Sequence, residues 1–273
     1  MSFSTTEPPF RFRAGTSPLL ISMPHVGTHV PSALAARFTP EAREVHDTDW
    51  HLEQLYDFAD ELGASVLVAT HSRYVIDLNR PPDGASLYPG QSVTGLCPVD
   101  TFNGTPIYAH GQVPGEVEIA QRREAIWEPY HRKLALELSV LRAAHGIALL
   151  WDAHSIRSVV PRFFTGTLPD FNLGTNKGAS CDTLLEQVVF DAAQQAAPGY
   201  TSVLNGRFTG GYITRNYGVP EKGVHAIQLE MTQSSYMQER MPFNYLKGTA
   251  RGVQVHLRRM LETALGFAYA SKG

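Results

Sequence analysis

Several polar residues follow, or end, short apolar runs that are typical of buried strands. They are His25 after residues 18–23, Asn79 and Arg80 after 74–78, His154 after 147–151, and Glu230 near the end of 224–231. In open α/β sheets the loops at the carboxyl ends of parallel strands converge on one edge, where ligands bind. We therefore expect these residues, distant in sequence, to meet at one rim of a sheet.

His25 and His154 have the chemistry of zinc ligands. Neutral imidazole binds zinc well, and a residue at a strand end is easily aimed at a common point. Gly27 and Ser155, which lie beside them, permit close approach of the backbone. The alternative is that each histidine only bonds to nearby backbone. Because both lie at strand ends, we favour metal ligation.

A carboxylate would complete a site made of two histidines and one acid. Asp47 and Asp49 are the candidates, and both precede a segment with helical periodicity. An acidic residue in that place is also a common helix cap. The residues alone leave open which aspartate caps and which binds metal.

Glu230 is a lone carboxylate in the apolar run 224–231. Burying an unpaired charge costs free energy, so this residue needs a partner or a function. A general base beside an activated water would fit, and a structural ion pair is the alternative.

Three arginines and a glycine pair are candidates for binding a substrate. Arginine presents a planar fork that matches a carboxylate, and its common alternative role is a salt bridge. Arg80 lies beside Asn79, and Arg157 and Arg215 lie in polar loops. Gly210–Gly211 could form the wall of a tight pocket or a simple turn.

The elements that position these residues can be expected from hydrophobic periodicity. We expect strands at 18–23, 64–69, 74–78, 147–151 and 224–231, and helices at 49–62, 116–144, 183–196 and 243–266. Pro129 should kink or split the helix at 116–144. Residues 81–114 should form a long loop, and 166–180 is rich in Gly, Pro and Asn. This alternation predicts an α/β fold, one domain over residues 1–273, with an open, mostly parallel sheet flanked by helices.

Composition excludes several other classes of protein. The net charge is −3 and no basic cluster is visible, which argues against nucleic-acid binding. No apolar run approaches the length of a membrane span, and the first 15 residues lack a secretory signal. Cys97 and Cys181 are too few for a disulfide framework, so we expect reduced thiols and a cytoplasmic protein. The chain also lacks the GxSxG, GxxxxGK[ST] and GxGxxG motifs.

Seven segments, in order along most of the chain, resemble the N-formylglutamate amidohydrolase family. They are PLLISMPHVGTHVP, DTDWH, SRYVIDLNRP, LLWDAHSIRS, LPDFNLGT, NGRFTGGYITRNYG and HAIQLEMTQSSYM. Each segment is weak evidence alone, whereas the ordered set is specific. The resemblance implies a fold similar to that of zinc carboxypeptidases and aspartoacylase.

The resemblance also implies roles for particular residues. His25 and His154 would bind one divalent metal ion, expected to be Zn²⁺, with an aspartate between them in sequence, and Glu230 would be the general base. Carboxypeptidase-like enzymes supply the first histidine and the carboxylate from an HxxE motif, but here Thr28 stands in the place of the glutamate. The carboxylate must come from elsewhere, and we prefer Asp49.

The implied reaction is hydrolysis of N-formyl-L-glutamate to formate and L-glutamate, a step of bacterial histidine degradation. Arginines would bind the two carboxylates of this small-molecule substrate. Two alternatives share most of these residues: a metal-dependent deacylase for another N-acyl amino acid such as an N-acetyl compound, and a non-catalytic metal-binding protein of the same fold. The sequence carries no signal for an oligomeric state.

Overall fold

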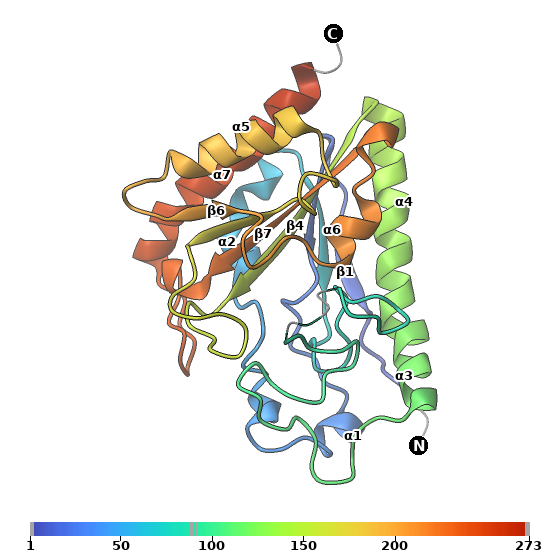
Figure 1. Ribbon diagram of the computed structural model, residues 1–273. Coiled ribbons are helices and arrows are strands. Elements are labelled where there is room, and N and C mark those ends of the chain that lie inside the picture. The colour runs from blue at the N-terminus through green and yellow to red at the C-terminus, as the bar shows by residue number, and fades with distance from the viewer. Residues whose placement is uncertain (1–2, 88–89, 91, 271–273) are drawn as a thin grey trace.

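The computed structural model describes residues 3–87, 90 and 92–270, which form a mixed sheet between two layers of helices (Figure 1). The order of the seven described strands is β1-β3-β2-β4-β7-β5-β6. Their bounds are β1 Phe10–Arg13, β2 Leu19–Met23, β3 Ser65–Ala69, β4 Ala148–Ile156, β5 Phe171–Gly174, β6 Ser202–Leu204 and β7 Val224–Thr232. Strands β3, β2, β4 and β7 run parallel, while β1 is antiparallel to β3, and β5 is antiparallel to β7 and parallel to β6. The expected open, mostly parallel sheet is confirmed.

Helices cover both faces of this sheet. The α-helices are α1 Ser32–Ala35, α2 Leu52–Leu55, α3 Glu116–Arg122, α4 Glu128–His145, α5 Thr183–Gln194, α6 Tyr212–Tyr217 and α7 Lys247–Ala270. Single 3₁₀ turns lie at Ala42–Glu44, Asp57–Asp60, Pro220–Lys222 and Gln233–Ser235. Helices α2, α5 and α7 lie on one face, and α4 and α6 on the other (Figure 1). All residues of β2, β3 and β4 are buried, as a parallel sheet covered on both faces requires.

The parallel strands carry their carboxyl ends to one edge. His25 lies two residues beyond β2, and Asp152 of β4 pairs with Ser22 of β2. Farther along the same strand, His154 pairs with Glu230 of β7. Residues paired in adjacent parallel strands point to the same face of the sheet. The sheet itself therefore places His154 beside Glu230.

Strand β4 is longer than expected, because it continues from Ala148 to Ile156 instead of ending at residue 151. His154 consequently lies within the strand rather than in the loop after it. Pairing with β7 over the whole length of β4 satisfies the backbone of the polar segment 152–155. The extended backbone continues for this reason even though the side chains turn polar.

The strand expected at 74–78 is wrong, because this buried segment is a series of turns. Its backbone groups bond to other partners: the Val75 amide donates to Ser72 O (2.8 Å), and the Asp77 amide donates to Leu96 O (2.7 Å). Arg122 Nη1 donates to the carbonyl of Val75 at 2.9 Å. An apolar run can thus be buried without a neighbouring strand when side chains satisfy its carbonyls.

The helix expected at 49–62 is reduced to α2 and the following 3₁₀ turn. His51, which has a left-handed backbone (φ 62°), immediately precedes α2, and Tyr56 follows its last residue. The Tyr56 hydroxyl accepts a hydrogen bond from Trp151 Nε1 at 3.0 Å, which ties this segment to β4. Strands β1, β5 and β6 and helix α6 were not expected from the sequence.

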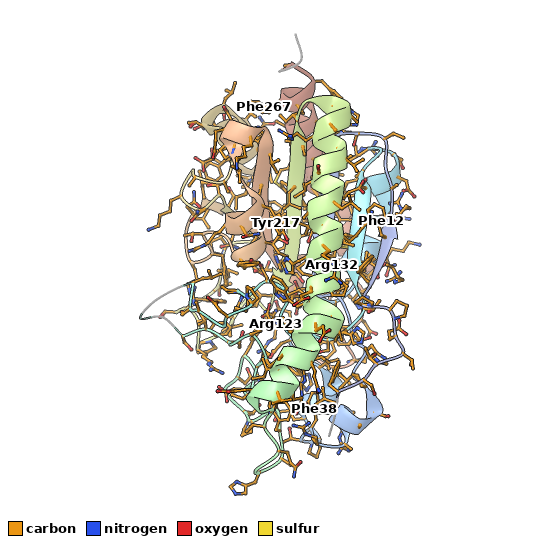
Figure 2. All side chains as sticks on the ribbon, turned by 90° about the vertical axis from the view of Figure 1, so that its right-hand side faces the viewer. Phe12, Phe38, Arg123, Arg132, Tyr217 and Phe267 are labelled. Carbon is orange, nitrogen blue, oxygen red and sulfur yellow. The ribbon has the colours of Figure 1, made fainter. Side chains whose placement is uncertain are left out.

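The long helix expected at 116–144 is continuous but irregular, and Figure 2 shows it running along one side of the molecule. Between α3 and α4 the residues Arg123–Trp127 form a π-helical segment, and Pro129 lies in the first turn of α4. The missing amide of the proline is therefore accommodated by a wider turn rather than by a break. The expected helices at 183–196 and 243–266 correspond to α5 and α7.

No helix in the described ranges combines the length and apolar character needed to cross a membrane.

Candidate functional site

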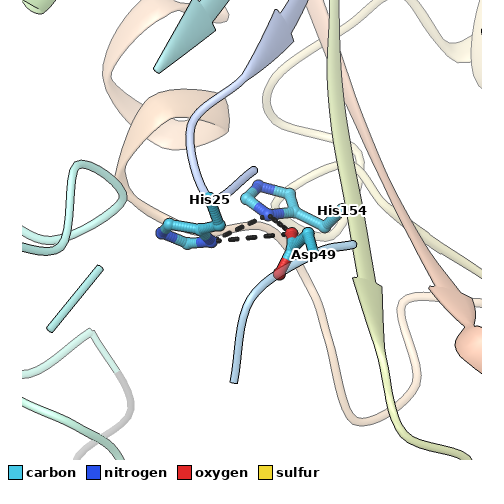
Figure 3. A group of neighbouring side chains, drawn as sticks. All are labelled: His25, Asp49 and His154. Carbon is cyan, nitrogen blue, oxygen red and sulfur yellow. Dashed lines mark hydrogen bonds and ion pairs between the residues drawn. The ribbon is translucent and has the colours of Figure 1, made fainter. Parts of the chain in front are cut away.

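Three buried side chains, His25, Asp49 and His154, converge at the carboxyl edge of the sheet (Figure 3). The Nδ1 atoms of the two histidines are 3.1 Å apart. Asp49 Oδ2 lies 3.2 Å from His154 Nδ1 and 3.8 Å from His25 Nδ1. Gly27, two residues beyond His25, is packed against the backbone of the segment after β3, since a Cβ there would lie 2.3 Å from the carbonyl oxygen of His71.

The outward nitrogens of both histidines face carboxylates. His25 Nε2 lies 2.7 Å from Asp77 Oδ1, and His154 Nε2 lies 3.0 Å from Asp152 Oδ2. When Nε2 of each ring donates to its carboxylate, both Nδ1 lone pairs point at each other and at Asp49. Metal-binding histidines are commonly oriented in this way. The cluster then holds three acceptors and requires a cation or a proton at its centre.

The surroundings shift the pKa values of the two histidines in opposite directions. Burial, reinforced by the positive charge of Arg73, lowers the pKa of His25. Burial also acts to lower the pKa of His154, but the charges and hydrogen bonds of Asp152 and Asp49 raise it well above its usual value. The carboxylates around His154 therefore favour positive charge at that ring, whereas burial and Arg73 disfavour it at His25.

The cluster fits a divalent metal. Ligand atoms at ~2.0–2.1 Å from a tetrahedral zinc are about 3.3 Å apart, close to the separations of 3.1, 3.2 and 3.8 Å found here. The second oxygen of Asp49, Oδ1, is buried and has no hydrogen-bond partner among the described residues. Two neutral imidazoles and a carboxylate are also the donor set of many catalytic zinc sites.

Asp47, the other candidate for the carboxylate, bonds elsewhere. Its Oδ2 accepts hydrogen bonds from the Tyr74 hydroxyl (2.6 Å) and from the Phe102 amide (2.7 Å). Burial raises its pKa, and these two bonds oppose that shift. Asp47 thus holds the loop at residue 102, and among the two aspartates only Asp49 belongs to the histidine cluster.

The carboxylate of Glu230 lies next to this cluster. Burial raises its pKa to about 8, with His154 opposing the shift and Asp49 reinforcing it. Among the described residues no salt bridge joins Glu230 to a basic side chain, although the charges of His154 and Arg73 act to lower its pKa. A structural ion pair, the alternative considered from the sequence, therefore has no support here. A buried carboxylate with a raised pKa beside a cation site suits proton transfer.

Glu230, His25 and His154 border one cavity, whose lining is mixed polar and aromatic. The lining residues are His25, Arg73, Asn79, Arg80, Ser92, Val93, Phe102, His154, Ser155, Ile156, Phe163, Arg207, Phe208, Gly211, Gln228 and Glu230. A concave, largely apolar site with a few convergent polar groups is the usual form of a small-molecule site.

Asn79, which lines the cavity, connects the start of α6 to β4. Its Oδ1 accepts a hydrogen bond from the Ile213 amide at 2.8 Å, and its Nδ2 lies 3.3 Å from Asp152 Oδ2. Gly211 makes this contact possible, because a Cβ there would lie 2.3 Å from Asn79 Nδ2. The glycine is required for the close approach of these two segments.

The arginines expected to bind a substrate occupy different places. Arg80 lines the cavity and is oriented by Thr94, to whose carbonyl its Nε donates at 2.8 Å. Arg215 and Gly210 are not among the residues that line the cavity; the Nε of Arg215 donates to Gly210 O at 2.8 Å. Arg157 lines neighbouring hollows instead, where its Nη2 lies 2.9 Å from Asn103 Oδ1.

The structure brings two further arginines to the cavity that the sequence did not single out. Arg73 is buried, pairs with Asp77 (2.8 Å) and lies 3.7 Å from Asp49 Oδ1. Arg207 lines the cavity from the loop after β6. Both lie in segments that resemble the amidohydrolase family, SRYVIDLNRP and NGRFTGGYITRNYG. Their position in these segments is the sequence signal that could have identified them as candidates.

The fold and site define a class: an α/β protein with a buried His–Asp–His cluster beside a carboxylate, in a cavity at the carboxyl edge of a mixed sheet. The model of the family described as N-formylglutamate amidohydrolase matches residues 17–237. The chain belongs to the N-formylglutamate amidohydrolase family.

Relatives and solved structures agree with this placement. The chain is 53% identical over 256 residues to N-formylglutamate deformylase of Pseudomonas aeruginosa, covering 94% of this chain and 96% of the relative. It is 52% identical to N-formylglutamate deformylase of Pseudomonas putida, covering 94% and 95%. The crystal structure of N-formylglutamate amidohydrolase from Ralstonia eutropha JMP134 superposes with a TM-score of 0.79 at 23% identity, covering 97% of this chain and 98% of that one. A gene product of Agrobacterium tumefaciens gives a TM-score of 0.72 at 17% identity, covering 95% and 96%. At these identities the two structures support the fold alone.

Proposed function

We propose that this protein hydrolyses N-formyl-L-glutamate to formate and L-glutamate, a step of histidine degradation. The single observation that carries the proposal is the meeting of His25, Asp49 and His154 with Glu230 in one cavity. The names of the two Pseudomonas relatives, which match nearly the whole chain, supply the substrate.

His25, Asp49 and His154 would hold one divalent cation, and the donor set favours zinc. When bound, such an ion polarises an acyl carbonyl and acidifies water. Asp77 and Asp152 fix the two imidazoles through their Nε2 atoms, so that both Nδ1 atoms face the cation position. Since the ligands must lose their protons, the affinity for the cation should fall in acid.

Glu230 would transfer the proton in both halves of the reaction. Its carboxylate accepts a proton from the water that adds to the formyl carbon, and then returns it to the amide nitrogen as the C–N bond breaks. Formate and the free amine of glutamate are the products. A buried carboxylate with a pKa raised to about 8 is suited to hold the proton between these two steps.

Positive charge near the reacting carbonyl would come from Arg73, whose Nη1 lies 3.7 Å from Asp49 Oδ1 and whose guanidinium carbon lies 4.6 Å from the centre of the Phe102 ring. Arg80 would bind one carboxylate of the substrate. Each charge-assisted hydrogen bond of this kind contributes roughly 1.5–3 kcal/mol.

Formate release by the purified, zinc-loaded protein tests the proposal. Hydrolysis of N-formyl-L-glutamate should exceed that of N-acetyl-L-glutamate, which carries an additional methyl group on the acyl carbon. Faster cleavage of the acetyl compound would make the protein a deacylase of another acyl class. Absence of hydrolysis of both compounds would leave a metal-binding protein without this activity and would overturn the proposal.

A further inference from the structure

We propose that Gln228 determines specificity by donating a hydrogen bond to the side-chain carboxylate of the substrate. This inference rests on the proposed function and deepens it, since N-formylglutamate carries a carboxylate at the end of its side chain. Gln228 lies on β7, two residues before Glu230, and both residues line the cavity. Gln228 is only 3% exposed, so its amide must find its hydrogen-bond partners inside the protein or in a ligand.

The orientation of the Gln228 amide is fixed by Gly211. The Gly211 N–H donates to Gln228 Oε1 at 2.7 Å. Because a backbone N–H can only donate, the atom that faces it must be the oxygen, and the two N–H groups on Nε2 point elsewhere. Within the described ranges, Nε2 has no hydrogen-bond acceptor. Leaving a buried donor without an acceptor costs free energy, which an acceptor on a ligand in the cavity would recover.

Asp152 lies opposite Gln228 in the sheet, but its oxygens have other partners. The parallel pairing of β4 with β7 places these two residues side by side. Asp152 Oδ2 lies 3.0 Å from His154 Nε2 and 3.3 Å from Asn79 Nδ2. Its Oδ1 accepts a hydrogen bond from Ser22 Oγ at 3.4 Å. The nearest carboxylate of the sheet is therefore bound to the histidine side of the site and leaves the Gln228 amide to the cavity.

The spacing of Gln228 and Glu230 selects the side-chain carboxylate of the substrate. Residues i and i+2 of a strand point to the same face, and the side chains of Gln and Glu are equally long. When they extend alike, their polar ends are roughly 7 Å apart, which is two residue rises. With Glu230 at the amide nitrogen of the substrate, the side-chain carboxylate reaches across this distance through two methylene groups. The α-carboxylate is attached directly to Cα and stays close to Glu230.

The support of the Gln228 amide is tightly packed. A Cβ at Gly211 would lie 2.3 Å from Asn79 Nδ2, so the two segments approach more closely than any other residue at position 211 would allow. The Ile213 amide donates to Asn79 Oδ1 at 2.8 Å, which holds this junction together. The donor of Gln228 is thus preorganised, so that little ordering is needed when the acceptor binds.

The test exchanges the donor without disturbing this support. Gln228→Glu keeps an oxygen to accept from Gly211 and replaces the donors with a second carboxylate oxygen. The measured quantities are kcat and KM for N-formylglutamate, N-formylglutamine and N-formylnorvaline, whose uncharged side chain has the same number of carbon atoms. The preference for N-formylglutamate over N-formylglutamine should fall by at least ~10-fold, mainly through KM, because repulsion replaces a charge-assisted hydrogen bond. N-formylnorvaline should change least, since it offers no acceptor.

Two further variants separate hydrogen bonding from added charge and from loss of a buried amide. Gln228→Met adds no charge and should raise KM for N-formylglutamate by about 10-fold, with little effect on N-formylnorvaline. Gln233→Met is the matched control. Gln233 is as buried as Gln228, lies just beyond β7, donates to Thr48 O at 2.9 Å and is not among the residues that line the cavity. This variant should keep the substrate preferences of the wild type.

Wild-type substrate preferences in Gln228→Glu, with its fold verified by thermal unfolding, would overturn the inference. An equal loss with all three substrates would also overturn it, because it would indicate a role in the fold or at the α-carboxylate. If Gln228→Glu does not fold, an unchanged KM for N-formylglutamate in Gln228→Met decides against the inference. These results leave the proposed function intact, whereas a wild type inactive on N-formylglutamate would refute the proposed function and the inference with it.

Discussion

Asp47 and Asp49 are separated by a single residue but have different surroundings, so their substitutions should have different effects. Asp49→Asn should abolish zinc binding, because it removes the only carboxylate of the histidine cluster formed by described residues. Asp47→Asn should keep zinc but lower the unfolding temperature, since it weakens the bonds to Tyr74 and Phe102. Elemental analysis and thermal unfolding of both variants are the measurements. Zinc loss in Asp47→Asn with retention in Asp49→Asn would reverse the assignment.

The role of Glu230 is tested by a change that preserves its shape. Glu230→Gln should keep zinc content and KM for N-formylglutamate nearly unchanged, and lower kcat by at least ~10²-fold, the lower end for general acid–base catalysis. Steady-state kinetics together with metal analysis make the comparison. A variant with normal turnover and a lower unfolding temperature would show that the carboxylate is structural.

At the residue scale, the sequence predicted which residues lie near one another at the sheet edge better than it predicted which partner each side chain contacts. His25, His154 and Glu230 could be expected together, because each lies at the end of an apolar run and parallel strands share an edge. The arginines could not be separated in the same way. Arg157 and Arg207 both lie in polar loops, and only the fold shows that one lines a neighbouring hollow and the other lines the cavity.

At the element scale, the buried parallel strands could be predicted because their apolar runs are continuous. Strands β5 and β6 could not, since β6 has only three residues and β5 is four residues long in a segment rich in Gly, Pro and Asn. These short strands are formed by pairing with β7 and with each other, a tertiary effect that no local pattern records. The prediction of a strand at 74–78 failed for the same reason. Side chains of α3 and α4, rather than a neighbouring strand, bond to the carbonyls of this segment.

The last residue of the π-helical segment Arg123–Trp127 contacts the backbone of the site. Trp127 Nε1 donates to the carbonyl of Arg80 at 3.1 Å, and His131 Nε2 lies 2.9 Å from the carbonyl of Leu78. The irregular helix thus secures the backbone on both sides of Asn79. π-Helical turns are frequent at functional sites.

Trp127→Phe tests this connection, because it removes the indole N–H and keeps an aromatic ring. The lost hydrogen bond contributes ~1 kcal/mol, so KM for N-formylglutamate should rise by about 5-fold while kcat changes little. Steady-state kinetics should show this split at unchanged zinc content. An unaltered KM combined with reduced stability would mean that the indole only supports the fold.

At the scale of the whole molecule, helix α4 covers one face of the sheet and carries a histidine with an unusual pKa. Burial lowers the pKa of His131 to about 4, from 6.5, while its bond to Leu78 O opposes the shift. Between pH 6.5 and 4 the unfolded chain binds the proton and the folded protein does not. Stability therefore rises with pH in this window and is lost as pH falls through it.

The predicted contribution of His131 is roughly 3 kcal/mol, at 1.36 kcal/mol per pKa unit. His131→Gln, which cannot titrate, should lose less unfolding free energy than the wild type between pH 6.5 and 4. Neighbouring arginines lower the pKa values of Asp77 and Glu118 against the effect of burial, so these carboxylates lose their stabilisation only as pH falls below their ordinary pKa values of 3.8 and 4.5. Denaturant unfolding at several pH values is the measurement, and identical pH dependence in both proteins would contradict the prediction.

The central claim is that one divalent ion, held by His25, Asp49 and His154, serves the hydrolysis of N-formylglutamate. The most direct measurement is formate release by chelator-treated protein as a function of bound zinc. The account predicts negligible hydrolysis without metal and a rate that increases linearly until one ion is bound per chain. Full activity of the metal-free protein, or a rate that rises only with a second bound ion, would contradict it.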